Sequence, residues 1–182
     1  RVKVQAAGPI TLAAQLELPR GHRAITDHGA VRDLAASLAE GVAAHRAEIA
    51  RRLDTTVVVQ FDEPVLPAAL AGRLTGVTSL TRVHPVDEAV AIGLIDDCVA
   101  AVDAPVILHC CASDLPWKTL LRTAVHALSV DVSTLADRDH DGLGEFVDSG
   151  RTVLLGLVPA EPPPARPSFE QTAHAAAELV DR

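Results

Sequence analysis

Runs of β-branched residues alternate with helical patterns along this 182-residue chain, and no other feature constrains its fold as strongly. Parallel neighbouring strands need a crossover connection, usually a helix, so strict alternation predicts a parallel sheet. Five strands are expected, over Val2–Ala7, Val57–Glu63, Val106–Ala112, Ala127–Ser133 and Thr152–Pro159.

The expected helices follow from apolar residues spaced three or four apart. The longest runs from Asp27, which has the side chain of an N-cap, to Leu53. A second covers Asp87–Val102, with Cys98 on its apolar side, where packing in the core is expected. Shorter helices are expected over Leu115–Ala124, Asp139–Ser149 and Ser168–Asp181.

Two architectures satisfy this alternation, an open doubly wound sheet and a closed barrel. The open sheet is typically marked by a G-x-G-x-x-G turn, whereas the first strand here is followed by Gly8-Pro9-Ile10-Thr11, an expected turn. Each strand ends in polar or special residues, as at the C-terminal face of a barrel. We therefore predict an α/β fold, a parallel (β/α) barrel of TIM type. Because closure needs eight strands and about 250 residues, residues 1–182 should form part of a barrel catalytic domain, about five βα units, with the remaining strands outside this chain.

Charge and composition exclude several classes of protein. The formal net charge is −8 with no run of Lys or Arg, which argues against a nucleic-acid partner. No segment reaches the roughly 18 apolar residues of a membrane helix. Three cysteines give no disulfide framework, and no basic and apolar leader precedes the first strand, so a cytoplasmic protein is expected.

The strongest chemical signal is Leu108-His109-Cys110-Cys111-Ala112, at the end of the third strand. Residues two apart on a strand face the same side, with Cα atoms about 6.6 Å apart, so His109 and Cys111 point together and Cys110 points away. Imidazole nitrogen and thiolate both bind zinc, at about 2.0–2.3 Å. Cysteines are also commonly buried as small apolar side chains, so the spacing alone leaves both interpretations open.

Two carboxylates end other strands. Asp62 ends the second, and Asp131 lies on the fourth with Ser133 on the same face. Because sequential strands are neighbours in a barrel, Asp131 should lie beside His109 and Cys111. The alternatives are a helix cap or loop ion pair for Asp62, and backbone amide partners for Asp131.

Four motifs taken together resemble the cobalamin-independent methionine synthase family, and the likeness is closer to its short, barrel-only members. They occur in order between Val2 and about Pro159: Gly8-Pro9-Ile10-Thr11, Gln60-Phe61-Asp62-Glu63-Pro64, His109-Cys110-Cys111 and Val130-Asp131-Val132-Ser133. The resemblance implies a zinc-bearing (β/α) barrel that moves a methyl group to the sulfur of homocysteine.

By this resemblance, His109 and Cys111 match the family's zinc ligands, and Asp131 falls where the family has a Glu ligand. Asp62 matches the acid that holds the amino group of homocysteine, and Gln60 belongs to the same substrate-binding motif. Zinc makes a bound thiol a thiolate near neutral pH, and the thiolate is the nucleophile. The second implied partner is a methyl donor, either methylfolate or a methylcorrinoid.

Three departures from the family pattern keep alternatives open. Asp131 is one methylene shorter than Glu, the family's last Cys ligand has no counterpart in residues 1–182, and a Trp that stacks on the pterin is absent near Gln15. The alternatives are methyl transfer involving another small thiol, and a non-catalytic barrel that binds metal or ligand. A porphyrinogen decarboxylase is poorly supported, because that chemistry needs no His-x-Cys pair.

Overall fold

The sheet has five parallel strands that pair in chain order. The computed structural model describes residues 1–19, 21–76, 83–158 and 167–180. The strands are β1 (Val2–Ala7), β2 (Val57–Asp62), β3 (Val106–Cys110), β4 (Ala127–Asp131) and β5 (Thr152–Gly156), in the order β1-β2-β3-β4-β5. A doubly wound sheet reverses its strand order at a switch point, and this sheet does not.

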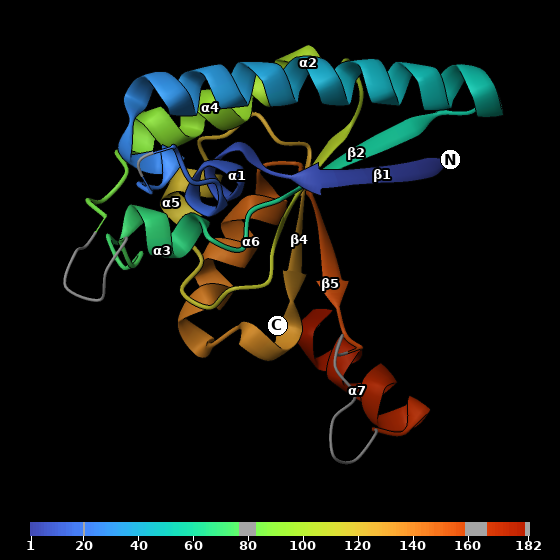
Figure 1. The fold of residues 1–182 in the computed structure, drawn as a ribbon. Helices are drawn as coiled ribbons and strands as arrows, with labels where there is room; N and C mark the ends of the chain where they lie inside the picture. Colours follow the sequence, from blue (N-terminus) through green and yellow to red (C-terminus); the bar gives the residue numbers. More distant parts are fainter. Residues whose placement is uncertain (20, 77–82, 159–166, 181–182) are drawn as a thin grey trace.

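The winding is therefore that of a TIM-like barrel, and the α/β class is confirmed. The sheet twists strongly, so that β1 and β5 run in very different directions (Figure 1). Twist of this kind is found in sheets that curve toward a barrel. Among the described residues β1 pairs only with β2 and β5 only with β4, so closure of the barrel is not shown.

Seven α-helices and three 3-10 turns occur in the described residues, and α2 lies beside α4 on one side of the strands (Figure 1). They are α1 (Pro9–Gln15), η1 (Ala24–Thr26), α2 (His28–Leu53), α3 (Leu66–Leu70), α4 (Glu88–Ala101), α5 (Trp117–Leu120), η2 (Val132–Thr134), η3 (Asp137–Asp139), α6 (His140–Asp148) and α7 (Phe169–Val180).

The two long helices begin where the sequence predicts. Asp27 caps α2, its Oδ1 accepting a hydrogen bond from Ala30 N at 2.9 Å, and Asp87 caps α4 in the same way. Each carboxylate satisfies an amide that has no partner within the helix. Cys98 is fully buried, as predicted, and its Sγ contacts Ala35 O on α2 at 3.8 Å, so the contact joins two helices.

One face of the sheet is apolar and packs against the helices. The strand residues on this side belong to a single core with α2 and α4. The strand registers bring these residues side by side: Val4, Ala6, Val59, Phe61, Leu108, Cys110, Leu128, Val130, Val153 and Leu155. The opposite face carries the polar residues of the strands, as the period of two requires.

Several predicted boundaries were wrong. Strands β2, β3 and β4 end one or two residues early, and β5 already ends at Gly156. Ser133 lies in η2, not on the strand face with Asp131. The expected turn after β1 is helix α1, which begins with Pro9 because proline suits the first helical position. Helix α5 covers only Trp117–Leu120 of the predicted Leu115–Ala124. The predicted ends Pro159 and Asp181 lie outside the described residues.

Arg151 joins β5 to the end of α5. Its guanidinium donates to the carbonyl oxygens of Leu120, Leu121 and Thr123 at 3.0–3.2 Å and lies 4.0 Å from the ring centroid of Phe146. Leu120 O also accepts hydrogen bonds from Thr123 N and Thr123 Oγ1, so the arginine adds to the bonds that close the end of this short helix. The contact fixes the segment that connects β3 to β4.

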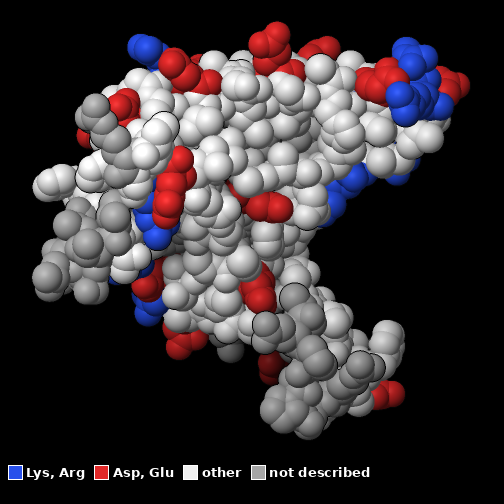
Figure 2. Space-filling view, viewed as in Figure 1, with Lys and Arg blue, Asp and Glu red and all other residues white. Residues whose placement is uncertain are grey.

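Acidic and basic side chains are mixed on the face of the molecule shown in Figure 2, with no continuous basic patch there. None of the helices in the described residues is long and apolar enough to cross a membrane.

Candidate functional site

Polar side chains gather on the uncovered face of the sheet, at the carboxyl ends of β2, β3 and β4. The registers pair Gln5 with Gln60, Asp62 with His109, and His109 with Ser129. Because all the strands are parallel, these ends lie along one edge of the sheet, which is where (β/α) proteins carry their chemistry. The sequence-predicted residues Gln60, Asp62 and His109 are thus on neighbouring strands and on one face.

Asp62 is held by the amides of two glutamines. Its Oδ1 accepts a hydrogen bond from Gln60 Nε2 at 2.6 Å, and its Oδ2 lies 3.5 Å from Gln5 Nε2. Gln60 is buried, and its Oε1 accepts from Lys3 Nζ at 2.7 Å. A chain of hydrogen bonds therefore runs from Lys3 on β1 through Gln60 to Asp62.

His109 has one ring nitrogen fixed by β4. Nδ1 lies 3.1 Å from Ser129 O and 3.2 Å from Ser129 Oγ. A carbonyl oxygen only accepts, so Nδ1 of the neutral ring donates and Nε2 carries the lone pair. This is the arrangement of histidines that bind metals, whose second nitrogen is bonded to a carbonyl or carboxylate.

The two adjacent cysteines have opposite environments. Cys110 lies in the apolar core, as the strand alternation predicts, and burial raises the pKa of its thiol to about 12. Cys111 follows the last residue of β3 and is exposed. Cys110 is therefore an inert packing residue, and Cys111 is the thiol that a metal ion or solvent can reach.

Asp131 is engaged by its own turn. Its Oδ1 accepts hydrogen bonds from Ser133 N at 2.9 Å and from Ser133 Oγ at 2.6 Å, which begins η2. Within the described ranges no group of three or more His, Cys, Asp and Glu side chains is arranged to hold a metal ion. The convergence of His109, Cys111 and Asp131 on one ion therefore stays a prediction.

Glu63 links the ends of β1 and β2 and was not singled out from the sequence. It is fully buried, and its two carboxylate oxygens accept three hydrogen bonds of 2.7–2.8 Å from Ile10 N, Thr11 N and Thr11 Oγ1. It thereby satisfies the first amides of α1. A Cβ at Gly8 would lie 2.3 Å from Glu63 Oε1, so only glycine allows this approach.

The stability of the protein should depend on pH through Glu63. Burial raises the pKa of Glu63 from 4.5 to about 7, against the lowering effect of its three hydrogen bonds. The folded state therefore binds more protons than the unfolded chain between these values. The free energy of unfolding should fall as pH rises from about 4.5 to about 7, by at most about 3 kcal/mol.

Urea unfolding of the protein and of Glu63→Gln at several pH values measures this effect. The amide does not titrate, so the difference between the two free energies of unfolding should change in favour of the variant as pH rises. A difference that is independent of pH from 4.5 to 7 would contradict the assigned pKa.

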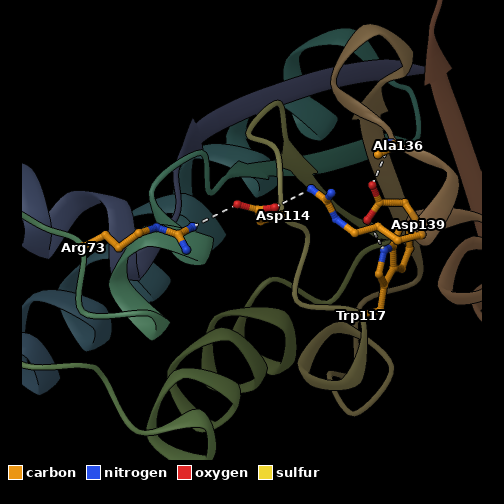
Figure 3. Close-up of polar contacts among 6 residues, drawn as sticks. Arg73, Asp114, Trp117, Ala136 and Asp139 are labelled. Atoms are coloured by element: carbon orange, nitrogen blue, oxygen red, sulfur yellow. Dashed lines mark hydrogen bonds and ion pairs between the residues drawn. The ribbon is translucent and has the colours of Figure 1, made fainter.

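Ion pairs connect the segments that follow β2, β3 and β4. Asp114 accepts from Arg138 Nη2 at 2.5 Å and lies 3.5 Å from Arg73 Nη2 (Figure 3). Beside this contact, Trp117 Nε1 donates to the buried Asp139 at 2.9 Å (Figure 3). These contacts hold three connections together near the polar edge of the sheet.

Chain-order winding and polar strand ends define a parallel (β/α) protein whose chemistry belongs to the carboxyl edge of its sheet. The family described as cobalamin-independent synthase, catalytic domain, matches residues 1–182, so the chain belongs to this family. No curated protein matches the chain. Membership confirms the resemblance seen in the four motifs and makes this a synthase-type catalytic domain, consistent with methyl transfer.

Sequence reasoning missed Lys3, Gln5 and Ser129 as partners of the predicted residues. One signal was available, since Lys3 and Gln5 alternate with valines on β1 and must therefore face away from the core. Their contacts with Gln60 and Asp62 depend on the register between β1 and β2, which a single strand does not reveal.

Proposed function

We propose that this chain transfers a methyl group to the sulfur of homocysteine, with a zinc ion at His109 and Cys111. The observation that carries the proposal is the side-by-side position of Asp62 and His109 at the ends of β2 and β3. An acid that can hold an ammonium group and a metal-type histidine are then close enough to act on one small amino acid.

The residues present fit zinc in two respects. His109 has its Nδ1 on Ser129, which leaves Nε2 as the nitrogen for the metal, and Cys111 is an exposed thiol. When bound, zinc would lower the pKa of a coordinated thiol, so that thiolate is present near neutral pH. Asp131 would be the third ligand through Oδ2, while its Oδ1 holds Ser133.

The remaining roles belong to the chain itself. Asp62 would accept the α-ammonium group of homocysteine, and Gln60 would keep the Asp62 carboxylate in place. Ser129 would keep His109 in one tautomer. The methyl donor, methylfolate or a methylcorrinoid, and a thiol acceptor other than homocysteine are open within this proposal.

We also propose that residues 1–182 form part of a closed barrel whose remaining strands lie outside this chain. The chain-order winding and the uncovered polar face support this. In a closed barrel that face is the interior, where side chains such as Lys3 and Gln60 would lie away from bulk water.

Asp62→Asn should separate substrate binding from metal binding. Loss of a charged hydrogen bond should lower the affinity for homocysteine about 10- to 100-fold, while the zinc content should be unchanged. Calorimetric titration with homocysteine, alongside metal analysis, measures both. Asp148→Asn, on the exposed end of α6, is the matched control and should bind as the unaltered protein does.

Two results would count against the proposal. If Asp62→Asn binds homocysteine as tightly as the unaltered protein, Asp62 is not the ammonium acceptor. If the protein as purified retains zinc or binds homocysteine but transfers no methyl group, the non-catalytic barrel that binds metal or ligand is the better account.

A further inference from the structure

Lys3 is a charged residue on β1, between Val2 and Val4. Among the described residues, its side chain has one hydrogen-bond partner, the side-chain amide of Gln60. Its Nζ donates to Gln60 Oε1 at 2.7 Å, across the β1–β2 pair. A lysine ammonium group donates and cannot accept. The oxygen of the Gln60 amide must therefore face Lys3, and its NH₂ group must face the other way.

The orientation of Gln60 decides what Asp62 meets. With Oε1 turned to Lys3, Nε2 donates to Asp62 Oδ1 at 2.6 Å. A flipped amide would place its oxygen against the carboxylate, and two acceptors at that distance repel each other. Gln60 is only 5% exposed, so water cannot readily replace either partner.

The second oxygen of Asp62 has a much weaker contact. Oδ2 lies 3.5 Å from Gln5 Nε2, at the limit of a hydrogen bond. An ammonium group has three strong donors and would displace that contact at little cost. The chain of contacts thus holds Asp62 Oδ1 firmly and leaves Oδ2 available to accept a hydrogen bond from a ligand.

We propose that Lys3 is a positioning residue for substrate binding: through Gln60 it fixes the Asp62 carboxylate so that Oδ2 receives the α-ammonium group of the thiol substrate. This rests on the proposed role of Asp62. The specificity that it adds is for thiols that carry an amino group over thiols that carry only a carboxylate.

Lys3→Met tests this, because methionine keeps the length of the side chain and removes the donor. Two ligands are titrated, homocysteine and 4-mercaptobutanoate, which lacks only the amino group. Lys3→Met should bind homocysteine about tenfold more weakly, as expected for about 1.4 kcal/mol, and should bind 4-mercaptobutanoate unchanged. Lys3→Arg, which restores a donor, should recover most of the affinity for homocysteine.

Lys118 is the only other lysine of the chain and is exposed on α5, so Lys118→Met is the matched control and should change neither affinity. Thermal unfolding of each variant establishes that it is folded at the temperature of the titration. The test therefore reads ligand discrimination in folded proteins, which a purely structural role of Lys3 would not alter.

The outcomes separate this inference from the proposed function. If the unaltered protein does not prefer homocysteine to 4-mercaptobutanoate, or if Asp62→Asn keeps the preference, the role of Asp62 fails and the inference with it. If Asp62→Asn loses the preference but Lys3→Met keeps it, the inference alone is overturned. If Lys3→Met weakens the binding of both ligands equally, the inference is also overturned, because Lys3 would then act on the carboxylate group that the two ligands share.

Discussion

Serine in place of Cys111 should give a folded protein that no longer retains zinc and has lost most of its methyl transfer activity. Cys111 is exposed and outside the core, so folding should be unaffected. Loss of the hydrogen-bond partner of a metal ligand lowers metal affinity roughly 10- to 100-fold, and loss of the ligand itself should lower zinc affinity by more than that. A free thiol with a pKa of about 8.5 is only a few per cent thiolate at pH 7, so activity should fall at least about 30-fold.

Cys110→Ala is the matched control, one residue away. Its thiol lies in the apolar core, so this variant should keep its zinc and lose only about 1 kcal/mol of stability. Metal analysis after dialysis, activity with homocysteine and thermal unfolding compare the two variants. If Cys111→Ser retains its zinc, or Cys110→Ala loses it, the assignment of the ligand is wrong.

Alanine in place of Gly8 should strongly destabilise the protein. The new Cβ would lie 2.3 Å from Glu63 Oε1 and 2.5 Å from its Cγ and Cδ. Glu63 cannot move without breaking its bonds to Ile10 and Thr11. Overpacking of this kind costs about 1–3 kcal/mol, and loss of the buried hydrogen bonds should raise the total above about 3 kcal/mol.

A double-mutant cycle with Glu63→Ala identifies the cause. Glu63→Ala alone should destabilise the protein by about 3 kcal/mol or more, because three buried donors lose their acceptor. It also removes the atoms that the methyl group meets. The cost of Gly8→Ala should therefore be much smaller in the Glu63→Ala background, and simple additivity of the two changes in urea unfolding would contradict the contact.

The parts of the fold that could be predicted are those encoded by local chemistry. Asp27 and Asp87 mark the first turns of α2 and α4 because their side chains bond nearby amides. Helix α1 could not be predicted in this way. Its first amides are satisfied by Glu63, 52 and 53 positions along the chain from its partners, and no local pattern contains that information.

The same distinction applies at the site. Strand alternation correctly predicted that Cys110 faces the core. The run Asp131–Ser133 looked like a continued strand because Val132 is β-branched, but the Asp131 side chain bonds Ser133 and turns the backbone into η2. Side chain and backbone competed there, and the short-range bond prevailed over β propensity.

The most direct test of a zinc-activated thiol is the number of protons released when homocysteine binds. Calorimetric titrations of the zinc-loaded protein at pH 7, in two buffers of different ionisation enthalpy, give that number. A bound thiol that becomes a thiolate should release about one proton per site, because the free thiol is almost fully protonated at this pH. Binding without proton release, or equal binding by the metal-free protein, would contradict thiol activation by this site.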